Sequence, residues 1–494
     1  MTARRSFVAA SLLLLLAAIV MLLRGCQEPS PRLRHAVKRR PRYTAQTRPD
    51  PPGRIGVLIA FIPQAALPPG GWTIETKLPL TVAPAWVVSP ALPFALDAAF
   101  GTMAVDVAPI GFRIAAAGTP PTAPIQSDAA RTRVGTFAVR GTVALTDLPR
   151  LVEQVLTQPE FVGLFGDPPL VSDVDEASCV LPPTGNASVV AQTSQQTTIL
   201  APKDVLLGIV DSGFSTAIIH AVAPDVKFDS NLGSTPSTAL GQPGSAPGDE
   251  HGNMCAYDAT LVATKATLID IRTADPLKLR LSDAEAAYNT LLGKLQTDPT
   301  LKTRYQGLVL SNSWGLATPD SNQKQSERYF DNANHPFTKV VVKLSTAGAD
   351  IVFAAGDSAL CPPGEGEVGS IWGANSLEEV VSVAAVDLNK SRISYSAQGP
   401  GTLATQKPDM SSYSHFVGSD DGDKDTGTSA SAAVVAGVIA AIRSQQGWGW
   451  LEKTPKEVKQ RLRDTAIREV KQGDTVVTLD GWSRDFGFGI ARVK

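Results

Sequence analysis

Three residues of different chemistry, far apart in the chain, each stand where a parallel sheet could bring them together. Asp211 ends the apolar run 205–210, which has the composition of a buried parallel strand. His251 opens a segment that can be helical, and Ser429 follows the glycine turn at Gly427. A carboxylate, an imidazole and a hydroxyl in contact can turn serine into a nucleophile. Together they predict acyl transfer.

Each residue taken singly also has a plain structural interpretation. Asp211 could cap a helix or turn, and His251 is one of 5 histidines, any of which could be a satisfied polar group. Ser429 could simply cap the helix that follows it. That helix, 432–442, is apolar all round, so it should be buried, and it is too short to span a bilayer.

Taken jointly and in this order, the signatures Asp211-Ser-Gly, His251-Gly and Gly427-Thr-Ser429 resemble those of the subtilisin-like serine proteases, peptidase family S8. The resemblance covers the chain from about residue 200 to its end. Six further stretches resemble family segments: 306–315, 350–357, 380–387, 394–399, 407–410 and 486–491.

The resemblance implies a serine endopeptidase with an acyl-enzyme intermediate. His251 would take the proton of Ser429, and Asp211 would orient and stabilise the imidazole. Two segments would pair with the backbone of a polypeptide substrate as added strands. Their residues are Ser313, Trp314 and Gly315, and Ala354, Ala355 and Gly356. Trp314 could wall a side-chain pocket or belong to the core.

Asp357 departs from the family, which usually has an asparagine there to donate a hydrogen bond to the oxyanion. An aspartate donates only when protonated. The carboxyl could work as a neutral acid, the enzyme could prefer mild acid, or catalysis could be weak. Asp357 could also be a capping residue that points away from the site. The alternative function is therefore an attenuated or inactive peptide-binding scaffold.

Composition sets the broad class. The 494 residues are 43% hydrophobic and 19% charged, with a net charge of −2, which predicts a globular protein without a nucleic-acid footprint. We divide the chain into an N-terminal signal or membrane anchor (1–26), a basic Pro-rich tether (27–54), a β-rich region of unknown role (55–133), a propeptide-like strand–helix–strand region (134–178), a linker (179–203) and a subtilisin-like catalytic domain (204–494).

Strands and helices alternate through 204–494, which predicts an α/β fold: a doubly wound parallel sheet with helices on both faces. The preceding region, 134–178, resembles half of the ferredoxin-like propeptide of subtilisin-like enzymes. Such an α+β domain would template folding and cover the cleft until cut, and self-cleavage would be expected within 179–203. A generic accessory domain is the alternative.

The N-terminal segment carries two opposing signals. Arg4 and Arg5 precede an uncharged apolar run, 7–23, of signal or anchor type. The basic residues of 27–54 follow that run, which would keep the rest of the chain on the cytoplasmic side of the membrane. The protease resemblance favours export, so we expect an exported, membrane-tethered protein of a bacterial periplasm or cell surface.

We expect no required cofactor and no metal in the active site. The acidic run 420–425 offers oxygen ligands for a structural calcium ion, but it lacks the spacing of a known loop, and a solvated loop is the alternative. The four cysteines have no CxxC spacing, so zinc is not expected. Cys255 and Cys361 could form a disulfide or remain buried thiols.

Overall fold

A computed structural model gives the arrangement of the chain. It describes residues 53–61, 86, 89, 91–107, 132–158, 161–168, 170–172, 184–185, 204–235, 241–247, 250–273, 280–316, 328–357, 368–417, 424–473 and 475–494. The apolar run 7–23 and residues 27–52 of the basic tether lie outside these residues, whereas Arg54, the last residue of the predicted tether, begins the first strand. Among the helices that are described, none has the length and apolar character needed to cross a membrane.

The larger part of the molecule is built on a seven-stranded sheet with strand order β14-β13-β12-β10-β7-β9-β8. Every neighbouring pair in it is parallel. Its strands are β7 (Asp204–Asp211), β8 (Lys227–Phe228), β9 (Thr267–Arg272), β10 (Tyr305–Asn312), β12 (Asp350–Ala354), β13 (Val381–Val386) and β14 (Met410–Tyr413). The apolar runs that predict strands at 205–210 and 308–310 therefore lie at the centre of the sheet, where both faces are covered.

Helices cover both faces of this sheet, as the alternating pattern predicts. Alternate residues of β7 enter two separate cores, Val205, Leu207 and Ile209 on one face and Leu206 and Val210 on the other. The first core is closed by α5 (Thr216–Val222), α6 (His251–Thr260), α10 (Gly427–Arg443) and α11 (Pro455–Thr465). The second is closed by α7 (Leu281–Thr297), α8 (Leu301–Arg304) and α9 (Pro336–Thr346). The doubly wound fold is confirmed.

Helix α10 is the most deeply buried of these elements. All of its residues, from Gly427 to Arg443, are buried, as the all-round apolar pattern predicts. A Cβ on Gly437 would lie 2.3 Å from the carbonyl oxygen of Ala259, so only glycine allows α10 to approach α6 so closely. At its far end Arg443 forms a buried bidentate ion pair with Asp350, with Nε–Oδ2 at 2.6 Å and Nη2–Oδ1 at 3.0 Å.

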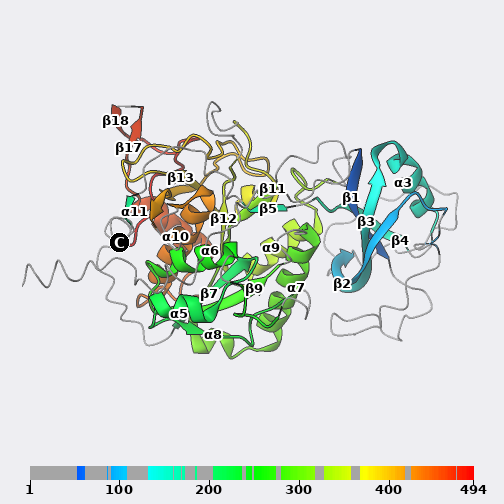
Figure 1. Cartoon of the computed structure of the whole chain (residues 1–494), viewed down its shortest axis with the longest axis horizontal. Helices are drawn as coiled ribbons and strands as arrows, with labels where there is room; N and C mark the ends of the chain where they lie inside the picture. Colours follow the sequence, from blue (N-terminus) through cyan, green and yellow to red (C-terminus); the bar gives the residue numbers. More distant parts are fainter. Residues whose placement is uncertain are drawn as a thin grey trace, which may run out of the picture.

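A separate N-terminal sheet lies beside the catalytic sheet, on the side of α7 and α9 (Figure 1). It is antiparallel with the order β2-β3-β1-β4. Its elements are β1 (Arg54–Phe61), β2 (Ala95–Val107), β3 (Thr132–Ala144), η3 (Leu145–Asp147), α3 (Leu148–Leu156) and β4 (Phe161–Gly166). The strands β1 and β2 from 55–133 thus fold together with the strand–helix–strand of 134–178, around a core that includes Ile59, Leu151 and Val155.

Three small sheets and one short helix complete the fold. β5 (Leu170–Ser172) pairs with β11 (Trp314–Leu316), and β6 (Thr184–Gly185) pairs with β15 (Phe416–Val417), which also pairs with β16 (Lys424–Asp425). β17 (Glu469–Gln472) and β18 (Thr475–Thr478) form a hairpin at the far end of the molecule from the N-terminal sheet (Figure 1). The 3-10 helix η5 (Gly373–Ser376) lies next to the substrate-binding segments predicted from the sequence.

Candidate active site

The structure brings Asp211 and His251 into direct contact. Asp211 is the last residue of β7 and His251 the first residue of α6, so both lie at the carboxyl edge of the sheet. His251 Nδ1 donates to Asp211 Oδ1 at 2.8 Å, and the N–H of Ser212 donates to the same oxygen at 2.7 Å. Both side chains are almost fully buried. Because Nδ1 holds the proton, Nε2 is the nitrogen that can act as a base.

Ser429 occupies the third position of α10, at the positive end of the helix. Its Oγ donates to the carbonyl oxygen of Ser313 at 3.1 Å, and Ser313 Oγ donates back to the Ser429 carbonyl oxygen at 3.1 Å. A hydroxyl has one proton to donate, so proton transfer to His251 requires the Ser429 O–H to turn away from the Ser313 carbonyl. The reciprocal contact fixes the backbone of Ser429 beside the predicted substrate segment.

Cys255 lies between the Asp211–His251 pair and Ser313, the residue that contacts Ser429. Its Sγ lies 3.6 Å from Asp211 Oδ2 and 3.7 Å from His251 Nδ1, and its side chain is hydrogen-bonded with Ser313. Burial and the Asp211 charge raise the pKa of the thiol well above its ordinary value. The sulfur therefore stays protonated, which makes it a poor nucleophile and a poor metal ligand.

Among the described residues, Asp211, His251 and Cys255 form the group whose possible ligand atoms are close enough together to hold a metal ion. The ligand atoms of Asp211, His251 and Cys255 all lie within 4.8 Å of one another. However, His251 Nδ1 already donates to Asp211, and a protonated thiol is not a metal ligand. The donor set fits a proton relay better than a metal centre. Cys255 is a free buried thiol, and Cys361 lies outside the described residues.

Asp357 lies at the start of α10, beside Ser429. Its Oδ1 accepts from the N–H of Thr428 at 2.9 Å and from Thr428 Oγ1 at 2.8 Å. Thr428 Oγ1 in turn accepts from the N–H of Gly356 at 3.1 Å. Asp357 therefore caps the nucleophile helix through an acceptor oxygen, at Thr428, the residue before Ser429.

The turn before Ser429 is held by residues to which the sequence assigns no role. Gly427 has φ +77°, a conformation that favours glycine. Its N–H donates to Tyr395 Oη at 2.8 Å, and its carbonyl accepts from Ser414 Oγ at 2.8 Å. The Tyr395 ring stacks on His415, with ring centroids 5.5 Å apart. The segment 394–399 resembles a family segment, but nothing in it identifies Tyr395 as the partner of the glycine turn.

The two predicted substrate-binding segments lie side by side. Ser313 and β11 follow β10, and Ala355 and Gly356 follow β12. Asn375 Nδ2 donates to the carbonyl oxygens of Trp314 at 3.0 Å and of Ala354 at 2.9 Å, so one buried amide bridges both segments. The sequence gives no signal for Asn375, because its partners are backbone atoms that are distant in the chain.

Trp314 is part of the core rather than of an open pocket wall. Its side chain is 1% exposed, its Nε1 donates to the Val210 carbonyl at 2.9 Å, and its ring packs edge-on against Phe353 with centroids 5.2 Å apart. The indole thus anchors β11 to the core of the catalytic sheet. The backbone of β11 is left to pair with another strand.

The chain itself lies on that backbone. Leu170–Ser172 pairs antiparallel with β11, Leu170 opposite Leu316 and Ser172 opposite Trp314. Leu170 is fully buried in the core that contains Trp314. In this register the chain runs along β11 toward Ser313 and Ser429. The segment that connects the N-terminal sheet to the catalytic sheet therefore occupies the position that the resemblance assigns to a substrate strand.

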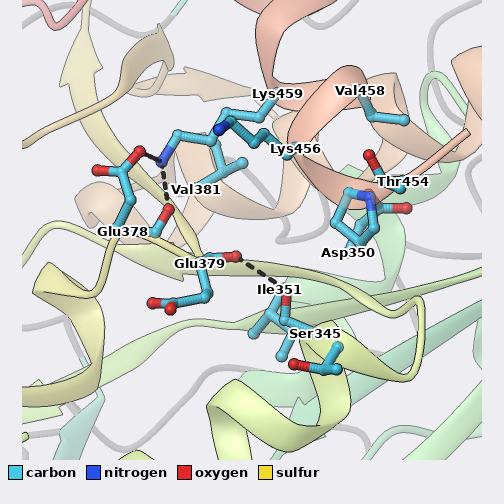
Figure 2. Close-up of a pocket in the computed structure, with 12 residues that line it drawn as sticks. Ser345, Asp350, Ile351, Glu378, Glu379, Val381, Thr454, Lys456, Val458 and Lys459 are labelled. Carbon is cyan, nitrogen blue, oxygen red and sulfur yellow. Dashed lines mark hydrogen bonds and ion pairs between the residues drawn. The ribbon is translucent and has the colours of Figure 1, made fainter.

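A cavity of about 410 Å³ lies elsewhere in the fold (Figure 2). Asp350 and Val381, the first residues of β12 and β13, line it together with Thr454 and Lys459 of the α11 region. It is therefore at the amino edge of the sheet, opposite the edge that carries the candidate active site. Lys459 at its rim donates to the Glu378 carbonyl oxygen at 2.6 Å (Figure 2). The acidic run 420–425 lies mostly outside the described residues.

Comparisons with known proteins give the family of the chain. The chain is similar to the structures of the epidermin leader peptide processing serine protease EpiP from Staphylococcus aureus (14% identity over 72% of this chain and 89% of that chain, TM-score 0.47) and of a lanthipeptide protease (16% identity over 64% and 98%, TM-score 0.44). A search among curated proteins finds no matching sequence. The model of the subtilase family, Peptidase S8, matches residues 202–489. Because that match spans more than half of the chain, the protein belongs to the subtilase family of serine peptidases.

Proposed function

We propose that the protein is a serine endopeptidase that hydrolyses peptide bonds through Asp211, His251 and Ser429 by way of an acyl-enzyme. The observation that carries this proposal is the buried contact of 2.8 Å between His251 Nδ1 and Asp211 Oδ1. It leaves Nε2 as a base, at the same sheet edge as Ser429. Family membership supports the same reaction class.

The proposed reaction has two halves. Ser429 Oγ attacks the carbonyl carbon of the scissile peptide while its proton passes to His251 Nε2. His251 then gives that proton to the leaving nitrogen, the C–N bond breaks, and an ester forms on Ser429. A water molecule attacks the ester, again losing its proton to His251, and the acid leaves as Ser429 regains its proton. Asp211 stays ionised and stabilises the imidazolium in each half.

Stabilisation of the oxyanion is the unusual part of the site. The N–H of Ser429, at the positive start of α10, is a suitable backbone donor. The family resemblance implies a second donor at position 357, but Asp357 uses Oδ1 as an acceptor toward Thr428. An ionised Asp357 would oppose a second negative charge nearby. The acceptor role of Asp357 favours the alternative function, an attenuated or inactive peptide-binding scaffold. The pH profile of peptide cleavage by an Asp357→Asn variant distinguishes this scaffold from an active endopeptidase.

We further propose that the protein is made as a precursor whose own chain fills the cleft. The pairing of Leu170–Ser172 with β11 supports this, because it is the pairing that an extended polypeptide substrate would make. The same register favours self-cleavage within the first few peptide bonds after Ser172, upstream of the linker 179–203. Sequencing the N-terminus of the mature protein tests this position.

The activity is tested by labelling with a fluorophosphonate, which reacts with an activated serine. The mature protein should be labelled on Ser429, and Ser429→Ala should abolish the labelling. Ser431→Ala is the matched control, because Ser431 is a buried serine of the same helix whose Oγ donates to the carbonyl oxygen of Ser412 at 3.0 Å. Cleavage of an internally quenched peptide with blocked ends distinguishes an endopeptidase from an exopeptidase. A folded mature protein that remains unlabelled at every pH refutes the proposal.

We also propose that the protein is exported and tethered to a membrane through residues 1–26, on the bacterial periplasmic or outer side. The apolar run 7–23 and the expected polypeptide substrate favour this location, and the basic residues of 27–54 favour the cytoplasmic side. Digestion of intact cells or spheroplasts by an added protease, compared with lysed cells, distinguishes the two sides. The proposed chemistry uses side chains alone, so chelation of metal ions should leave the triad reaction intact.

A further inference from the structure

The N-terminal sheet contacts the catalytic sheet through the start of α7. Asp167 follows β4, is 1% exposed, and accepts from the N–H of Ser282 at 3.1 Å and from Ser282 Oγ at 3.2 Å. Ser282 is the second residue of α7. The residue at the N-cap position, Arg280, has no side-chain oxygen to accept from the helix start. Asp167 supplies that acceptor from outside the catalytic domain.

Charged groups surround this contact from both sides. Arg140 of β3 donates to both carboxylate oxygens of Asp283, at 3.0 and 3.2 Å, and Arg280 Nη1 donates to the Asp167 carbonyl oxygen at 2.9 Å. Glu285 of α7 is 1% exposed, and the nearby charge of Asp167 helps to raise its pKa. No described cation forms an ion pair with Glu285. Among the described residues, the cluster therefore holds three carboxyl groups, of Asp167, Asp283 and Glu285, and two guanidinium groups, of Arg140 and Arg280.

A histidine closes the same interface on the next helix. His335, fully buried at the start of α9, donates from Nε2 to the Gly166 carbonyl at 3.0 Å and accepts at Nδ1 from the N–H of Phe337 at 3.2 Å. This pair of contacts requires the neutral imidazole, because a proton on Nδ1 would remove the acceptor. The Phe165 ring lies edge-on to His335, with centroids 6.0 Å apart.

We propose that these contacts form a pH-dependent latch, which holds the N-terminal sheet on α7 in weak acid and loosens as the pH rises toward 8. The latch is the set Arg140, Asp167, Arg280, Ser282, Asp283, Glu285 and His335. The contacts of the latch do not depend on the proposed function, whereas a role of the latch in regulating access to β11 rests on that function. Opening the latch would draw Leu170–Ser172 away from β11, because only Pro168 and residue 169 separate Asp167 from Leu170.

The direction follows from the titration of the buried groups. Burial raises the pKa of Asp167 to about 6, and burial with the nearby Asp167 charge raises that of Glu285 to about 8. A carboxyl whose pKa is raised in the closed state strengthens closure fully below its ordinary pKa, and this contribution is lost as the pH rises through the raised value. Closure therefore weakens between about pH 4 and pH 8.

His335 acts in the opposite direction but in a different range. Burial lowers its pKa to about 4, so its contribution to closure is lost only as the pH falls from about 6.5 toward 4. Above pH 6.5 the carboxyl groups alone change their charge. For one proton released on opening, the opening equilibrium should rise about 10-fold per pH unit in the range where only the open state is ionised.

Hydrogen exchange of the full chain tests the latch without any need for catalysis. The chain should carry Ser429→Ala, so that it stays uncut, and exchange at β11 and at the first turn of α7 should be followed from pH 5.5 to 8.5 after correction for intrinsic rates. We expect opening to rise about 10-fold from pH 6.5 to 7.5. Exchange at β9 reports global unfolding and should remain slower than exchange at β11 at every pH in this range.

Glu285→Gln should flatten this dependence, because the amide has a similar shape and does not titrate. Glu153→Gln, on the exposed surface of α3, is the matched control and should leave the dependence as it is. If Glu285→Gln does not fold, Asp167→Asn keeps one oxygen acceptor for Ser282 and should also reduce the slope. An unchanged slope in the folded variant, or no dependence on pH, overturns the latch. Since no step uses Ser429, this result is independent of the labelling result.

Discussion

Replacing Leu170 by alanine should expose the cleft of the uncut chain. Leu170 is fully buried in the core that contains Trp314 of β11. It is the first residue of β5 and lies opposite Leu316 of β11. Truncating a buried leucine costs about 2–5 kcal/mol where the surroundings cannot collapse. The substitution destabilises only the closed state, in which Leu170 is buried, if the segment 170–172 is in water in the open state. Even 2 kcal/mol corresponds to about a 30-fold larger open fraction.

The rate of fluorophosphonate labelling in the uncut chain measures that fraction. The reaction should be sampled early and resolved on a gel, so that full-length protein is counted separately from cut protein. We expect Leu170→Ala to label about 30-fold faster than the parent as long as opening precedes labelling. Leu156→Ala is the matched control, since Leu156 lies on α3, the helix that packs on the N-terminal sheet, and is 65% exposed. Equal labelling rates for Leu170→Ala and the parent would refute the idea that this segment blocks Ser429.

Two further substitutions test the catalytic domain itself. Asp357→Asn keeps an oxygen acceptor for Thr428 and adds an N–H donor, so peptide cleavage near pH 7.5 should rise, up to about 10²-fold; an unchanged pH profile would mean that Asp357 only caps α10. Arg443→Ala removes one partner of the buried pair with Asp350 and should lower the free energy of unfolding by about 3–5 kcal/mol in denaturant titration. A loss below 1 kcal/mol there would show that the carboxylate is neutralised by other means.

The catalytic sheet could be predicted from the sequence because its signals are local and strong. The run 205–210 is apolar at every position, and a strand buried on both faces requires that. Asp211 could be placed at the carboxyl edge because it ends a strand of a parallel sheet, whereas its contact with His251 is what the family resemblance implies. The apolar pattern of 432–442 likewise predicts the burial of α10, since no face of that helix could be left in water.

Other parts of the site depend on contacts that no local pattern encodes. Leu170–Ser172 is a strand of three residues, too short for a periodic signal, and its partner β11 lies far along the chain. Asn375 is an ordinary polar residue in sequence, and its role comes from two backbone carbonyls on different segments. The N-terminal sheet is similar in this respect, because β1 pairs with β3 and β4 across a long separation in sequence.

We propose that one strand, β11, serves both substrate binding and latency. β11 can pair with any extended polypeptide, and in the intact chain the tethered Leu170–Ser172 competes at an effective concentration on the order of millimolar. Cutting the chain after Ser172 removes the tether but breaks none of the contacts Asp167–Ser282, Arg140–Asp283 and Gly166–His335, because each joins a residue before the cut to a residue of the catalytic domain. Cleavage alone should therefore leave the cleft covered. In the proposed scheme, activation then needs a second step that weakens the interface, and we expect a rise in pH to be that step because it ionises the buried carboxyl groups of the latch.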